Sequence, residues 1–172
     1  MKKFILFLLF LFVLSFTCFV VKISIDYNKN NKVIHHIEKI IPDQIESLIT
    51  DFDLYNMDID GNDYIGILNI DNYLLPIKAK CKSLDINCKV DASSFTIRGN
   101  NFKNSFIMYK EINDFSKVTF TNMLGQVFTY KIDNVKRVKN VKNINYDGDL
   151  ILIIQNYYSF EYIIYICNGI WT

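Results

Sequence analysis

The chain has 172 residues, of which 51% are hydrophobic and 22% charged, and its formal net charge is +1. This length holds one domain with a hydrophobic core and, once the N-terminus is set aside, is too short for two. The near-neutral charge, without a dense block of lysine and arginine, gives no electrostatic basis for binding nucleic acid. Aromatic residues make up 15% of the chain, with only six glycines and two prolines, a composition that favours a β-rich fold.

The N-terminus is an apolar segment between lysines. Lys2 and Lys3 precede an uncharged run over residues 4–21, and Lys22 closes it. As a helix this run spans about 27 Å, close to the thickness of the hydrocarbon core of a bilayer. The two N-terminal lysines are expected to stay inside the cell. The sequence therefore predicts a single-pass protein of the cell membrane whose remaining residues are extracellular.

The alternative to a permanent anchor is that this N-terminal segment is cleaved off, as a signal peptide or at a lipoprotein site. A signal peptide would carry small residues in an A-x-A-like pattern before the cleavage site, and none is present. A lipoprotein site at Cys18 would need small residues where Phe16 and Thr17 stand. We therefore expect an uncleaved signal-anchor over residues 1–22.

Residues 23–58 are expected to form a linker and two short helices. The segment KISIDYNKNNK (22–32) is polar and typical of a linker next to a membrane. VIHHIEKI (33–40) spaces its apolar residues as a helix does until Pro42 interrupts the pattern. PDQIESLITDF (42–52) begins with residues that favour a helix N-terminus and predicts a second helix.

From Tyr64 onward the pattern is that of strands. YIGILNI and YLLPIKA flank a turn at residues 71–72, and KVTFTN and QVFTYKIDNVKRV flank a turn at residues 124–125, as in a hairpin. SFTIRG, DLILII and EYIIYIC are further strands, and NSFIMYKEIN is a short helix. We predict an all-β domain over residues 59–172, with about seven to eight strands in a closed barrel.

The two histidines, His35 and His36, do not indicate a metal site. Adjacent residues of a helix point about 100° apart, so the two cannot face one ion, and we expect them to face solvent. Residues 37–172 contain no histidine, which excludes a histidine base within the barrel.

The segment NMDIDGNDY (56–64) resembles a calcium-binding loop only at its start. With Gly61 at the sixth position, the twelfth is Ile67, where such a loop needs a bidentate glutamate. A turn rich in Asp and Asn is the better interpretation. No metal and no cofactor are expected.

The cysteines leave one question open. Cys81 and Cys88 either form a disulfide, as an oxidising exterior permits, or remain free thiols. Cys167 lies within an apolar strand and is expected to be a buried small hydrophobic residue. No base or cation in its own strand would convert it to a nucleophilic thiolate.

Five segments, in this order, resemble those of sortases, the membrane-anchored cysteine transpeptidases of Gram-positive bacteria. YIGILNIDNYLLPIK resembles the opening strand pair, TIRGNNFKNSF the segment that carries the catalytic histidine, and KVTFTNMLGQVFTYKIDNV the long hairpin. LILIIQN resembles the strand that ends in the nucleophilic cysteine, and EYIIYIC the final strand, which normally begins with the catalytic arginine. The resemblance covers residues 60–172 and implies a sortase-like closed β-barrel.

The catalytic residues that this resemblance implies are replaced. Asn100 stands at the histidine position and Gln155 at the cysteine position, while the arginine position is Glu161 or Tyr162. In sortases the thiolate attacks a Thr–Gly bond, the histidine protonates the leaving amine and the arginine stabilises the oxyanion. Gln155 has no titratable group and is not a nucleophile, and Glu161 would add negative charge where negative charge develops. Asn100 cannot transfer a proton near neutral pH.

The sequence therefore predicts a pseudo-sortase at the cell surface that no longer cleaves. Its expected partners are the membrane and a sorting-signal peptide, an active sortase or a surface-protein substrate. The residues expected around the degenerate centre, where a peptide would bind, are Arg98, Asn100, Gln155 and Glu161. The alternative is a diverged transpeptidase or hydrolase whose nucleophile has moved to Cys81 or Cys88.

Overall fold

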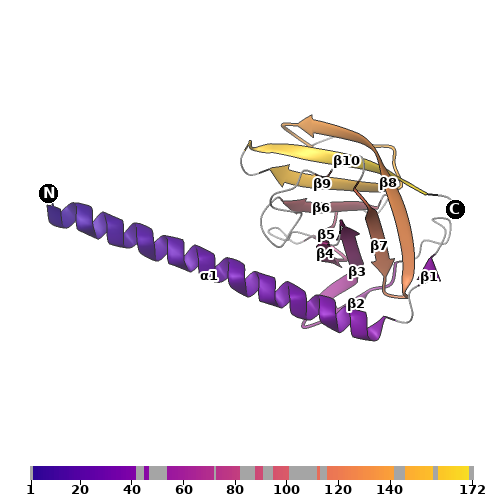
Figure 1. Cartoon of the computed structure of the whole chain (residues 1–172), viewed down its shortest axis with the longest axis horizontal. Helices are drawn as coiled ribbons and strands as arrows, with labels where there is room; N and C mark the ends of the chain where they lie inside the picture. Colours follow the sequence, from indigo (N-terminus) through magenta and orange to yellow (C-terminus); the bar gives the residue numbers. More distant parts are fainter. Residues whose placement is uncertain are drawn as a thin grey trace.

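A computed structural model describes most of the chain, as one long helix and a β-barrel (Figure 1). The residues it describes are 2–41, 45–46, 54–71, 73–81, 88–90, 95–100, 112, 116–141, 146–156 and 159–170. The predicted helix NSFIMYKEIN falls almost wholly outside them.

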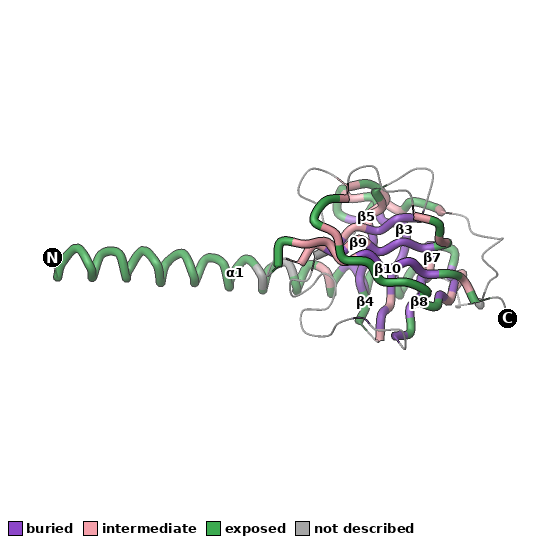
Figure 2. The backbone as a smooth tube through the Cα atoms, turned by 90° about the horizontal axis from the view of Figure 1, so that it is seen from above, coloured by how far each residue is buried: buried purple, intermediate pink, exposed green. Residues whose placement is uncertain are grey.

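The helix, α1 (Lys2–Ile40), has 39 residues and is about 58 Å long. Its N-terminal half projects away from the barrel, and residues 4–21 are exposed along their whole length (Figure 2). By length and composition α1 is the one helix in the described part of the chain that could cross a membrane. The prediction of an N-terminal apolar helix is confirmed.

The residues expected to form a linker, 22–32, are helical, because α1 continues through them without a break. The last turns of α1 bury Val33, Ile34 and Ile37 against the barrel, in a cluster that also contains Ile59 and Ile67. This packing holds the end of the helix in place, and an apolar helix precedes the polar residues. Tertiary packing therefore extends a helix through residues whose own propensity is low.

The two expected short helices differ in outcome. The helix predicted for VIHHIEKI is present and ends at Ile40, before Pro42, but it is the last part of α1 and not a separate helix. Within PDQIESLITDF, the described residues form a short strand, β1 (Ile45–Glu46), which pairs in parallel with residues 126–127. Residues 42–44 and 47–53 lie outside the described part. Pairing with a neighbouring strand outweighs a helical pattern in these two residues.

Nine further strands follow β1 in the described part of the chain. They are β2 (Met57–Ile59), β3 (Asn62–Ile70), β4 (Tyr73–Lys78), β5 (Cys88–Lys89), β6 (Thr96–Asn100), β7 (Val118–Asn122), β8 (Gln126–Val138), β9 (Leu150–Asn156) and β10 (Glu161–Gly169). Eight of them form a closed ring in the order β8-β10-β9-β6-β5-β4-β3-β7, and β7 pairs with β8 to close it. The predicted all-β closed barrel is confirmed, as is the β7–β8 hairpin.

The interior of the barrel is filled with buried apolar side chains of the described strands. Fully buried members include Leu68, Ile77, Ile97 and Phe128, contributed by four different strands. Phe95 packs edge-on against Phe120 with ring centroids 4.7 Å apart. Because every second residue of a strand points inward, this core dictates which residues of β6, β9 and β10 point outward.

Candidate functional site

The positions singled out from the sequence meet at the ends of three neighbouring strands. β6 runs parallel to β9, and the backbone of Asn100 is in register with Gln155. β10 runs antiparallel to β9, and Gln155 is in register with Tyr162. Residues from three separate parts of the sequence are therefore aligned in one row across the sheet.

The row lies on the outer face of the barrel. Leu152 and Ile154 of β9 belong to the interior core, and Ile151 belongs to a separate cluster outside it. Alternation along the strand places Gln155 on the same face as Ile151. Tyr162 is the register partner of Gln155 and shares that face. Both side chains are half-buried.

The register decides between the two candidates for the arginine position. Glu161 pairs with Asn156 and Tyr162 pairs with Gln155. Glu161 therefore belongs to the adjacent row, and by alternation its side chain leaves the strand on the opposite face. The residue beside Gln155 is the uncharged Tyr162, which can donate or accept a hydrogen bond through its phenol.

Arg98 lies on β6, two residues before Asn100 and on the same face of the strand. It pairs with Ile153 on one side and with Cys88 on the other, and its side chain is half-buried. Two residues along a strand correspond to about 7 Å, which a guanidinium can reach across. The side chain of Asn100 lies outside what the structure describes.

The outer face is covered along only part of its length. Val141 and Tyr146, from the connection between β8 and β9, pack against Ile151 and Ile166. The ammonium of Lys136 lies 5.5 Å from the centroid of the Tyr146 ring. Burial raises the pKa of the Tyr146 phenol. The sequence did not predict that Val141 and Tyr146 cover this face. A connecting segment has no periodicity that indicates which strands it crosses.

None of the four cysteines offers an accessible thiolate at this site. Cys81 and Cys88 are joined in a disulfide, with their Cα atoms 5.1 Å apart, which answers the question left open by the sequence. Cys167 is buried, as expected, and desolvation raises the pKa of its thiol to about 12. Cys18 is exposed within the apolar half of α1.

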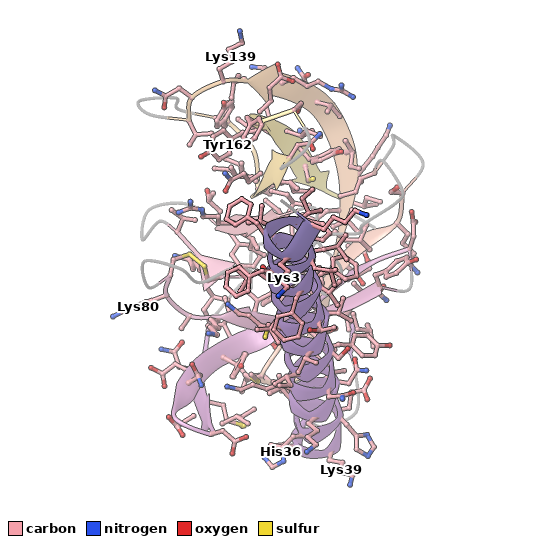
Figure 3. The ribbon with its side chains drawn as sticks, turned by 90° about the vertical axis from the view of Figure 1, so that its left-hand side faces the viewer. Lys3, His36, Lys39, Lys80, Lys139 and Tyr162 are labelled. Carbon is pink, nitrogen blue, oxygen red and sulfur yellow. A yellow bond between two sulfur atoms is a disulfide. The ribbon has the colours of Figure 1, made fainter. Side chains whose placement is uncertain are left out.

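The histidines lie far from the row. His35 and His36 are exposed near the end of α1, and His35 Nδ1 is 4.0 Å from Glu38 Oε2. Figure 3, seen from the N-terminal side of α1, places His36 at the bottom and Tyr162 in the upper part of the molecule. A histidine base is therefore absent from the site as well as from the barrel sequence.

The supposed calcium loop is a tight turn between β2 and β3. The amide of Gly61 donates to Asp58 Oδ1 at 3.2 Å, and Asp60 and Gly61 both have positive φ. This confirms the Asx-rich turn. Across the residues that the structure describes, no group of three or more His, Cys, Asp or Glu side chains is arranged to hold a metal ion.

The fold is similar to that of solved sortases. Sortase C1 from Streptococcus agalactiae matches with a TM-score of 0.53 at 15% identity, over 67% of this chain and 72% of that one. Sortase A from Corynebacterium diphtheriae matches with a TM-score of 0.50 at 13% identity, over 64% of this chain and 62% of that one. No family model matches the sequence, and no curated protein does. At such identities the likeness concerns the fold alone, and the chain has a sortase-like fold.

Proposed function

We propose that this protein is a membrane-anchored, catalytically inactive relative of sortases that binds an extended peptide over the ends of β6, β9 and β10. The proposal rests on the identity of the residues in the row. Gln155 aligns with Asn100 and Tyr162 at the strand ends, and none of the three carries a thiol. A neutral amide cannot form a thioester or ester with a substrate.

The chemistry of the row suits binding. Gln155 and Tyr162 supply hydrogen-bond donors and acceptors, and half-buried Ile153, the register partner of Arg98 beside the row, supplies apolar surface. Hydrogen-bonding groups beside apolar surface are typical of a site that recognises a peptide by shape and by a small number of hydrogen bonds. A sorting-signal peptide is the ligand that the sortase-like fold suggests. The same surface could also hold a surface protein or an active sortase.

The location follows from α1. Its apolar half is long enough to span a bilayer, and Lys2 and Lys3 favour an N-terminus inside the cell. In this arrangement the barrel is extracellular, an oxidising environment in which the bond between Cys81 and Cys88 persists.

Calorimetric titration of the full chain in lipid nanodiscs with a peptide that contains a Thr–Gly bond tests the binding. We expect Tyr162→Ala to weaken the affinity about tenfold, as truncation of an aromatic contact at the centre of an interface does. Tyr73→Ala is the matched control, because Tyr73 is an exposed tyrosine of β4, a different wall of the barrel. Unchanged affinity in the Tyr162 variant, or a scrambled peptide that binds equally well, would contradict the proposal.

A relocated nucleophile is tested in the same preparation. The unreduced protein is incubated with iodoacetamide and the alkylated cysteines are identified by mass spectrometry. We expect no label on Cys81 or Cys88, because their sulfurs are bonded to each other. Label on either one, suppressed by the peptide, together with cleavage of the Thr–Gly bond, would establish a diverged transpeptidase instead.

A further inference from the structure

The start of β10, which follows Phe160 directly, lies at the end of the barrel that faces the N-terminus of α1 (Figure 1). In Figure 1, this end of β10 reaches further toward the N-terminus than the other labelled strands of the barrel. α1 is continuous, and its last turns bury Val33, Ile34 and Ile37 against the barrel. The direction of α1 therefore determines which end of the barrel faces the N-terminus of the helix.

The start of the polar half of α1 marks the level of a membrane surface. The uncharged run ends at Val21 and is followed by Lys22. When residues 4–21 fill the hydrocarbon core of a bilayer, the headgroups lie at the next turns of the helix. The barrel stands beside those turns (Figure 1). Among the labelled strands of the barrel, the start of β10, next to Phe160, thus lies closest to the level of the lipid surface.

The turn between β9 and β10 carries the most exposed large hydrophobic side chain in the described part of the chain, Phe160, at 79% exposure. Its φ is +55°, a conformation that bulky residues rarely adopt and that glycine or asparagine would adopt at less cost. Segments that lie at a membrane interface bury Trp, Phe and Leu side chains at the boundary between headgroups and acyl chains.

We propose that the β9–β10 turn inserts Phe160 into the interfacial layer of the bilayer that α1 spans. The proposal rests on α1 being a membrane anchor. An isolated exposed aromatic residue often needs no explanation. Here the exposed residues 4–21 of α1 already require an apolar environment, and continuity with that segment brings the turn to the same lipid surface.

The contact would give the barrel a second attachment to the membrane. One helix holds a domain at a point, while a second contact on a different segment limits how far the domain can tilt. Tyr162 follows Phe160 by two residues, so the row on the outer face would then be held beside the lipid surface.

Depth-dependent quenching in vesicles tests the contact. Each variant carries Trp171→Phe and a single new tryptophan, introduced as Phe160→Trp, Leu124→Trp or Phe16→Trp. Leu124 is the matched control, because it is also an exposed hydrophobic residue of a hairpin turn, and it lies in the β7–β8 turn at the far end of the barrel (Figure 1). The full chain is reconstituted in phosphatidylcholine with brominated acyl chains, which quench a tryptophan that lies close to them.

We expect the tryptophan at position 160 to be quenched at least about twofold more than that at position 124, with emission at shorter wavelength. Equal quenching at positions 160 and 124, with strong quenching at position 16, would overturn the contact and leave the anchor in place. Weak quenching at position 16 as well would overturn both the anchor and the contact. Peptide binding to the row is measured separately, so its failure is distinguishable from either result.

Discussion

The two faces of β9 differ in how completely they are covered. The inward residues from Leu150 to Ile154 are buried in the closed core: Leu150, Leu152 and Ile154. On the outward face, burial decreases along the strand, from buried Ile151 to half-buried Ile153 and Gln155. The connection between β8 and β9 covers the beginning of the outward face.

This difference explains why so apolar a strand ends in an amide. The core requires apolar volume at every inward position, up to Ile154. The next residue, Gln155, points outward beyond the cover, where water can reach a polar group. A glutamine there costs little stability, and the strand can end in a residue suited to hydrogen bonding.

The largest expected effect is that of removing volume from the inward face. Leu152→Ala should lower the free energy of unfolding by about 3 kcal/mol, because it leaves a cavity in a rigidly packed core. Ile153→Ala, one residue further on the half-buried outward face, should cost about 1 kcal/mol. Denaturant melts of the full chain, followed by near-ultraviolet circular dichroism, measure both. Equal costs would mean that the two faces are equally buried, contrary to the structure.

A smaller effect is expected from alkaline pH, through the inward-facing thiol of β10. Burial raises the pKa of Cys167 from its ordinary value near 9 to about 12, so the folded state holds a proton that the unfolded state loses. Stability from this group is present below about pH 9 and is lost as the pH rises toward 12, by about 2 kcal/mol between pH 9 and pH 11.

Melts at a series of pH values compare the wild type with Cys167→Ala, which lacks the titrating group. The variant should lose less stability over this range. Burial also raises the pKa of the Tyr130 phenol, so some alkaline loss remains in the variant. A variant whose pH dependence equals that of the wild type would show that Cys167 is not protected from water.

The smallest expected effect tests the register on the outward face. In a Gln155→Cys background, Tyr162→Arg should lower the pKa of the introduced thiol by about one unit, because the two positions are directly opposite. Glu161→Arg, in the neighbouring row, should lower it less. The rate of alkylation of position 155 against pH, resolved by mass spectrometry, gives each value. A larger shift from Glu161→Arg would mean that the register is displaced by one residue.

Part of the candidate site could be predicted from the sequence. The alternation within β9 and β10 and the order of the five segments predicted a strand that ends near Gln155 and a final strand that begins at Glu161, as observed. The choice between Glu161 and Tyr162 could not be made, because a shift of one residue in register moves every side chain to the other face without changing the pattern. Tyr146 and Lys136 were missed because a connecting segment has no periodicity that reveals what it covers.

The same distinction holds for the whole protein. Sequence alone determined the apolar N-terminal helix, the strand-rich domain, the absence of a histidine from residues 37–172 and the amide at the end of LILIIQN, because each depends on residue identity or on a local period. Only the tertiary structure decided the continuity of α1, the strand at Ile45–Glu46 and the pairing of Cys81 with Cys88. These three depend on which distant segments come into contact, and a one-dimensional pattern does not contain that information.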